Sequence, residues 1–266
     1  MKRALLVFIP CCLALGGLAL GGLALAQSGL TPPRVGWVLD SGNHPRPLEG
    51  VAGNFWLGNS IENETVSIGS SGAAAVLKTA REVIVLDAQG RVVSKFPAPD
   101  GPAQFSFTAS GSPALVWFSQ TRELAYFEGS QLHRVPVNSS MLGGDVIALA
   151  ELSTTRATLL IERERAISLV SVDLRTGFVR FETGLPGLHA PAFLASDGTI
   201  LAAGHDDLVV RHPNSADIHL AFPVKPEAFT SLGNGWVLAQ GAQSAHYAIR
   251  VALSREQVFQ LPEARQ

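Results

Sequence analysis

The sequence has little cysteine, little lysine and no excess of positive charge. Its only two cysteines, Cys11 and Cys12, lie within the first 26 of 266 residues. If that segment is removed on export, the mature chain can form neither disulfides nor thiolate metal sites. The formal net charge is −2, with 20 basic and 22 acidic residues. A nucleic-acid partner needs concentrated positive charge, so we predict none.

The first 26 residues have the three-part order of a secretory signal peptide. Lys2 and Arg3 are positive, the stretch 4–23 has no charged residue, and Ala24-Leu25-Ala26 is a small-x-small cleavage site. We therefore predict a signal peptide at 1–26, a single domain at 27–266 and a periplasmic or secreted protein. The alternative is an uncleaved N-terminal anchor, because about 20 apolar residues are long enough to span a bilayer. That segment is the only membrane contact we expect.

No stretch after residue 30 shows the apolar period of an amphipathic helix. Apolar runs of roughly four to seven residues, rich in β-branched side chains, alternate instead with Gly, Pro, Asn, Asp and Ser clusters. This pattern predicts an all-β chain.

The stretch 81–97, REVIVLDAQGRVVSKFP, has the pattern of a β-hairpin around Asp87-Ala88-Gln89-Gly90. Similar hairpins recur at 125–137, 169–182, 208–223 and 248–262. Each is preceded by a turn of small residues and a mostly apolar run; these runs are 73–77, 114–118, 157–161, 199–203 and 236–240.

Glycine and proline residues at equivalent positions of these units recur at a nearly constant distance in the sequence. Gly72 and Gly111 are 39 residues apart, as are Pro97 and Pro136. A four-stranded meander of about 40 residues is typical of a β-propeller blade. In such a blade the second strand lies between neighbouring blades and is apolar on both faces, whereas the fourth strand lies at the outer edge and carries polar residues.

Five complete units fill residues 65–262, and the segment 34–60 precedes them. Its WVLD run and its RPLEGV run resemble third and fourth strands, and Asn54 to Gly58 adds one more strand-like piece. We predict six blades, with 34–60 as an incomplete blade that closes the ring against the fifth unit. The alternative is five blades with 34–60 as a cap.

The units resemble the exported bacterial propeller repeats of the TolB type and the WD40-like repeats. The best matches are the turn Ser196-Asp197-Gly198 and the hairpin Val172-Asp173-Leu174-Arg175-Thr176-Gly177. The resemblance covers about 200 residues and implies the fold only, because propellers serve as scaffolds, receptors and enzymes.

Polar clusters offer few candidates for chemistry. Gly204-His205-Asp206-Asp207, followed by His212, is the densest group. The repeat places His205 to Asp207 at a solvated blade corner and His212 at the other end of the same strand, about 15 Å away. Asp87, Asp173 and Asp197 lie in turns, where an aspartate stabilises the backbone without a metal. No Gly-x-Ser-x-Gly stretch is present on a strand-to-helix turn. We therefore predict no catalytic, cofactor-binding or metal-binding residue and no cofactor.

Four tryptophans, Trp37, Trp56, Trp117 and Trp236, lie in predicted strands. We expect them in the core, with Trp56 lining a rim as the alternative.

Two functions remain. The first is an exported, non-catalytic binding or scaffolding module with a protein or small-ligand partner at a propeller face. The alternative is a propeller enzyme, a lyase or hydrolase, with its site at the mouth of the central channel. The loops that enter the first strands carry only Asp100, Asp145, His189, Lys225 and Glu227 as reactive residue types. Three or more converging ionisable groups in the channel would favour the enzyme.

Overall fold

The computed structural model describes residues 32–242, 245–252 and 255–262. The chain divides into two compact units, Met1–Pro33 and Arg34–Gln266, and all described strands belong to the second. The predicted signal peptide lies outside the described residues and stays a prediction. Within the described part, no helix is long and apolar enough to cross a membrane.

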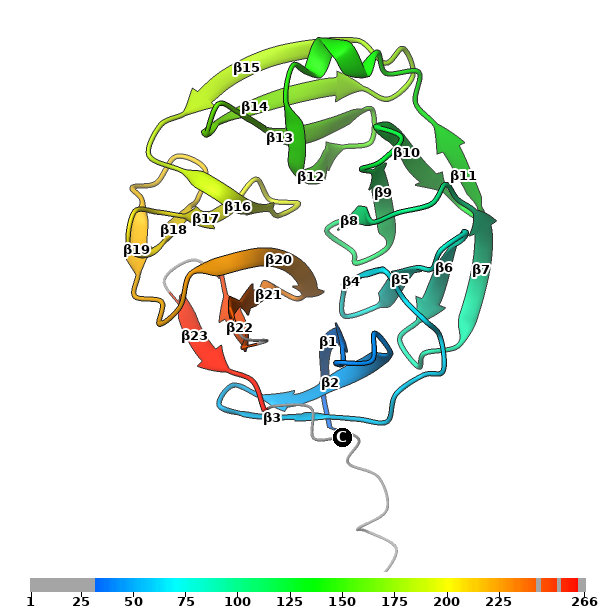
Figure 1. Cartoon of the computed structure of the whole chain (residues 1–266), viewed down its shortest axis with the longest axis vertical. Helices are drawn as coiled ribbons and strands as arrows, with labels where there is room; N and C mark the ends of the chain where they lie inside the picture. Colours follow the sequence, from blue (N-terminus) through cyan, green and yellow to red (C-terminus); the bar gives the residue numbers. More distant parts are fainter. Residues whose placement is uncertain (1–31, 243–244, 253–254, 263–266) are drawn as a thin grey trace, which may run out of the picture. The chain divides into compact units, whose positions relative to one another are not determined.

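The second unit is an all-β propeller of six antiparallel sheets (Figure 1). An N-terminal sheet, here called the closing sheet, has three strands: β1 (Arg34–Leu39), β2 (Pro45–Val51) and β3 (Asn54–Leu57). The first two complete sheets are β4 (Ser67–Ser70), β5 (Ala74–Lys78), β6 (Glu82–Asp87), β7 (Val92–Pro97), and β8 (Ala103–Phe107), β9 (Pro113–Phe118), β10 (Glu123–Glu128), β11 (Gln131–Arg134).

Three further four-stranded sheets complete the ring. They are β12 (Asp145–Ser153), β13 (Arg156–Arg163), β14 (Ala166–Asp173), β15 (Val179–Leu185); β16 (His189–Leu194), β17 (Ile200–Ala203), β18 (Leu208–Arg211), β19 (Ile218–Leu220); and β20 (Pro226–Gly233), β21 (Trp236–Gly241), β22 (His246–Arg250), β23 (Gln257–Gln260). A short 3-10 helix, η1 (Ser139–Leu142), precedes β12.

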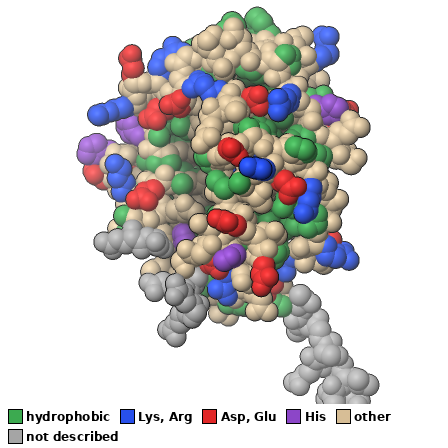
Figure 2. All heavy atoms as spheres, turned by 45° about the vertical axis from the view of Figure 1, so that its right-hand side comes forward, with side chains coloured by type: hydrophobic (Ala, Val, Ile, Leu, Met, Phe, Trp, Pro, Cys, Tyr) green, Lys and Arg blue, Asp and Glu red, His purple; other side chains and the backbone are tan. Residues whose placement is uncertain are grey.

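The predicted hairpins and second strands are confirmed. Every residue of β5 and of β17 is buried, as expected for strands covered on both faces by neighbouring blades. The outer strand β15 is exposed along most of its length. On the face in Figure 2, basic and acidic side chains are interspersed, with no broad patch of one sign.

Five strands surround the centre: β4, β8, β12, β16 and β20, here called the inner ring (Figure 1). The ring closes where β20 meets β4, through two serines. The Ser231 hydroxyl donates to the Ser70 carbonyl at 2.8 Å, and the Ser70 hydroxyl donates to the Ser231 carbonyl at 3.3 Å. We call this pair the serine clasp.

Among the described residues the closing sheet contributes no strand to the inner ring, and this corrects the predicted strand assignment. β1 packs behind the serine clasp, where the Trp37 amide donates to the Ser70 hydroxyl at 2.9 Å. Its four central residues are buried like those of a second strand, and β3 is exposed on alternate residues like an outer strand. The three strands therefore take the second, third and fourth positions, and the described residues supply no first strand. The sequence suggested third and fourth positions because the apolar run of β1 is short and ends in a turn.

The closing sheet fills the seam between the first and last complete blades, as predicted. One of its faces packs on the last blade through Val35, Val38 and Leu48, which contact a cluster containing Leu232 and Leu238. Its other face places Trp37 against the first complete blade, among Ile68, Ala75, Leu77, Ile84 and Leu86.

Two of the four tryptophans are core residues, as expected. Trp37 is 3% exposed and Trp117 is 2% exposed. Trp236 is half-buried and packs against Phe55 and Phe259 with ring centroids 5.6 and 5.8 Å apart. The core prediction is wrong for Trp56, which is 40% exposed because it lies on the outer strand β3.

Candidate functional site

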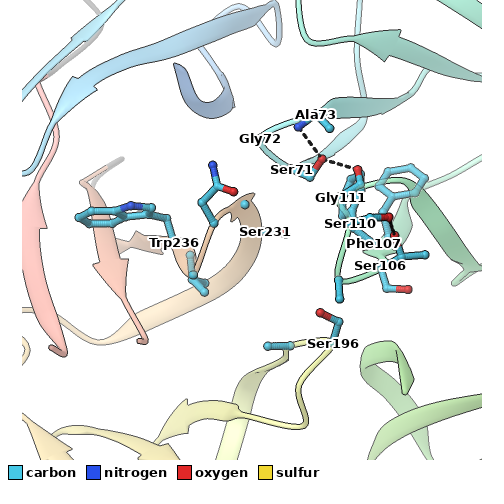
Figure 3. Close-up of a pocket in the computed structure, with 18 of the residues that line it drawn as sticks. Ser71, Gly72, Ala73, Ser106, Phe107, Ser110, Gly111, Ser196, Ser231 and Trp236 are labelled. Carbon is cyan, nitrogen blue, oxygen red and sulfur yellow. Dashed lines mark hydrogen bonds between the residues drawn. The ribbon is translucent and has the colours of Figure 1, made fainter. Parts of the chain in front are cut away.

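Two cavities are lined by inner-ring residues. The smaller has a volume of about 340 Å³ and lies among the turns that join inner to second strands in four of the sheets (Figure 3). Its hydrogen-bonding side chains include Ser71, Ser106, Thr108, Ser110, Ser196, Ser231 and Asn234, and its aromatic ones are Phe105, Phe107, Phe193 and Trp236. Hydroxyl, amide and aromatic groups thus surround a space that no ionisable side chain of the described residues lines.

The larger cavity has a volume of about 710 Å³ and is lined by all five inner-ring strands. Its side chains capable of hydrogen bonding are Asn43, Ser67, Gln104, Glu227, Thr230, Ser231 and Gln240. Phe105, Phe193 and Ser231 line both cavities, so the two spaces adjoin at these residues.

Ser71 connects two of the turns that line the smaller cavity, at a place here called its mouth. Its hydroxyl donates to the Gly111 carbonyl of the neighbouring blade at 2.5 Å and accepts from the Ala73 amide at 3.1 Å (Figure 3). Across the serine clasp, Gly233 has a φ of +94°, and a β-carbon there would lie 2.4 Å from the Gly72 nitrogen. Only glycine meets both conditions, so the turns of different blades are held in close contact at this mouth.

Strand β8 carries two buried, unsatisfied polar atoms on side chains that line the cavities. Ser106 is 5% exposed and lines the smaller cavity, and its hydroxyl has no hydrogen-bond partner in the described part of the chain. Gln104 lines the larger cavity. Its amide nitrogen donates to the Val146 carbonyl at 3.0 Å, which fixes the amide, and its Oε1 is buried without a partner in that same part.

Buried polar atoms are satisfied in the great majority of cases, and leaving one unsatisfied costs roughly 1–3 kcal/mol. Gln104 and Ser106 are two residues apart on one strand, so their side chains lie on the same face, about 7 Å apart along it. In the described structure the two oxygens are therefore unfilled hydrogen-bonding positions on one face of β8. Sequence reasoning missed it, because it looked for ionisable groups and these two side chains are neutral.

The reactive residues predicted for the channel do not converge. Of the five, only Glu227 lines either cavity in the residues that the structure describes. Asp145 is instead paired with Arg122 at 2.9 Å. The criterion of three converging ionisable groups is not met in this part of the chain.

The group at 204–207 lies in the turn between β17 and β18, as the repeat predicts. His205 pairs with Asp206 at 2.6 Å, and this carboxylate raises the pKa of the imidazole. Asp207 pairs with His219 at 2.7 Å.

His212 directly follows β18, at the opposite end of that strand from 204–207 as predicted, and it is 6% exposed. Its Nδ1 lies 3.0 Å from the Thr199 hydroxyl and its Nε2 lies 2.9 Å from Glu256. The hydroxyl, imidazole and carboxylate follow the order of a hydrolase triad, but Thr199 is 1% exposed and lines neither cavity. The network therefore joins two blades. A pairing across 44 residues leaves no local signal in the sequence.

The aspartates predicted to stabilise turns do so. The carboxylate of Asp87 accepts from the amides of Gln89 and Arg91, and that of Asp173 accepts from the amide and hydroxyl of Thr176. These hydrogen bonds hold the pKa of both carboxyl groups below the usual range. Among the described residues, no group of three or more His, Cys, Asp or Glu is placed to hold a metal ion.

No protein-family model and no curated protein sequence matches the chain. Among solved structures, it is similar to TolB from Acinetobacter baumannii, with 14% identity over 91% of this chain and 67% of that chain and a TM-score of 0.55. It is also similar to virginiamycin B lyase from Staphylococcus aureus (12% identity, 89% and 86% of the chains, TM-score 0.46) and to the WD40 domain of Pan2 from Neurospora crassa (10%, 88% and 80%, 0.48). At these identities the likeness to TolB shows the β-propeller fold alone.

Proposed function

We propose that the protein is an exported, non-catalytic binding module whose ligand occupies the two adjoining cavities. The observation that carries the proposal is the pair of partnerless buried atoms on β8, Ser106 Oγ and Gln104 Oε1. A ligand that donates hydrogen bonds to both would relieve a desolvation cost that the free protein bears.

The spacing of the two atoms favours an extended peptide as the ligand. Amide groups on one side of an extended chain recur about every 7 Å, which matches residues two apart on a strand. The neutral lining of the smaller cavity favours uncharged side chains, because a buried charge without a partner is costly. A segment of a protein partner or a short peptide meets these conditions equally.

Binding of capped, uncharged tetrapeptides tests the proposal, with a neutral trisaccharide as the comparison ligand. Ser106→Ala removes the hydrogen-bonding atom and should weaken binding by about fivefold, the equivalent of roughly 1 kcal/mol. The same change should leave the unfolding free energy equal or higher, because the lost hydroxyl has no partner. Ser94→Ala, on the outer strand β7, is the matched control. Absence of peptide binding, or equal affinities in both variants, would contradict the proposal, and preference for the trisaccharide would replace the peptide with a glycan.

The location is tested separately. Export with cleavage after Ala26 predicts that native material lacks residues 1–26. An intact mass that retains Met1 would contradict cleavage and favour the anchored alternative.

A further inference from the structure

A third cavity, of about 290 Å³, lies on the sheet β12–β15 and shares no lining residue with the two inner cavities. Its lining residues are Arg156, Ser171, Asp173, Thr176, Phe178 and Arg180. They come from three neighbouring strands and from the turn between β14 and β15.

The strand register explains why these side chains gather. Arg156 on β13 lies opposite Asp173 on β14, and Arg180 on β15 lies opposite Ser171 on β14. Ser171 and Asp173 are two residues apart and so point to the same face of the sheet. The two arginines therefore flank β14 from either side, with the Ser171 hydroxyl between them.

Both arginines lack a side-chain partner among the residues that the structure describes. In the described part of the chain, Arg156 and Arg180 form no ion pair and no side-chain hydrogen bond. Arg163, on the same strand as Arg156, shows the contrast, since it donates to the carbonyls of Gly143 and Leu142. Ser171 is 6% exposed, and its hydroxyl also lacks a hydrogen bond in this part.

Asp173 is the one acidic group among the described residues that line the cavity, and it is engaged in its turn. Its Oδ1 accepts from the Arg175 amide and from both the amide and the hydroxyl of Thr176. These bonds keep it ionised, so the cavity holds two positive charges and one negative charge.

Phe178 gives the cavity an apolar wall. It is 65% exposed, the highest exposure among the large hydrophobic residues of the described chain. An apolar group placed on this ring would remove from water a surface that the isolated protein leaves open.

We propose that this cavity binds an oxyanion, a phosphate or carboxylate group, borne by a ligand whose apolar part covers Phe178. The guanidinium groups of Arg156 and Arg180 would each donate to the anion in the paired geometry that arginine offers to such oxygens. The Ser171 hydroxyl would donate the remaining hydrogen bond. This inference is independent of the ligand in the inner cavities.

The test is a titration of the full mature chain with phenyl phosphate and with inorganic phosphate, followed through the amide NMR signals of residues 176–180. Phenyl phosphate should bind more tightly, because only it carries an apolar group for Phe178. Arg156→Gln and Arg180→Gln should each weaken binding by roughly three- to tenfold, the range for an exposed charge-assisted contact. Arg81 lies on another blade, is exposed and has no side-chain partner among the described residues. Arg81→Gln should therefore change the affinity by less than about twofold.

Asp173→Asn should raise the affinity of the cavity for phenyl phosphate. Asparagine keeps an oxygen that can accept from the turn but removes the negative charge, so binding should tighten. Vesicles of phosphatidylglycerol distinguish a lipid headgroup from a soluble anion. If the protein binds the vesicles, and binds them less well in the Arg156 and Arg180 variants, the ligand is a lipid. If it binds phenyl phosphate but not the vesicles, the ligand is a soluble anion. If neither phosphate compound shifts the signals of residues 176–180, or if the Arg81 variant loses as much affinity as the other two, the site does not exist.

Discussion

Leu48→Ala measures how much the closing sheet contributes to the ring. Leu48 is fully buried at the seam, in a cluster with Leu232 and Leu238 of the last blade. Truncation of a buried leucine to alanine costs about 2–5 kcal/mol, because both apolar contacts and filled volume are lost. In a domain of this size the loss corresponds to a fall in Tm of about 4–20 °C.

Val51→Ala is the matched control. Val51 lies on the same strand, β2, but is 57% exposed, so its truncation should cost about 1 kcal/mol or less. Equilibrium urea denaturation of both variants, with the wild type beside them, gives the two free energies. The reasoning fails if Leu48→Ala costs no more than Val51→Ala, since the inner ring would then be stable through the serine clasp alone and 34–60 would be a cap.

Three further changes probe other parts of the ring. Leu160→Ala removes a fully buried side chain on β13 and should cost about 2–5 kcal/mol by urea denaturation; a loss below about 0.5 kcal/mol would mean that it does not pack between blades. Burial lowers the pKa of Lys78, so at alkaline pH the unfolded chain binds more protons than the folded chain, and the unfolding free energy should rise as the pH approaches 10.5. Lys78→Met should lack this rise. If the unfolding free energies of the variant and the wild type differ by the same amount throughout pH 7 to 10, the prediction is wrong. His212→Leu removes a partner from Thr199 and from Glu256 and should lower the unfolding free energy by about 1–3 kcal/mol, and an unchanged midpoint would show that the network is dispensable.

The fold was predictable because each blade repeats its own local chemistry. Local residue patterns predict both the turn at Asp87 to Gly90 and the buried strand at 74–78. The spacing of 39 residues then indicates that such units are repeated blades. The first two strands of the closing sheet were predicted as third and fourth strands of a blade, but they occupy the second and third positions. The residues of β1 do not indicate which strands lie beside it.

The candidate sites were much less predictable. Ser106 and Gln104 are ordinary strand residues, and nothing in their local sequence indicates that their side-chain oxygens are buried without partners in the described structure. Arg156 and Arg180 lie 24 residues apart in the sequence, and the register of β13, β14 and β15 brings them to one cavity. His212 and Glu256 meet only because two blades lie side by side.

The serine clasp bears on the order in which the chain can fold. It joins residues 161 positions apart, and β1 rests against both of the strands that it connects. The N-terminal strands are the first to be synthesised, yet the face that carries Val35, Val38 and Leu48 has no partner until the last blade exists. Closure of so long a loop is slow. Chains that have not yet closed the ring expose apolar surface, which favours aggregation. Ring closure is therefore a late step, and any helper that shields residues 34–57 in the meantime would raise the yield of native protein.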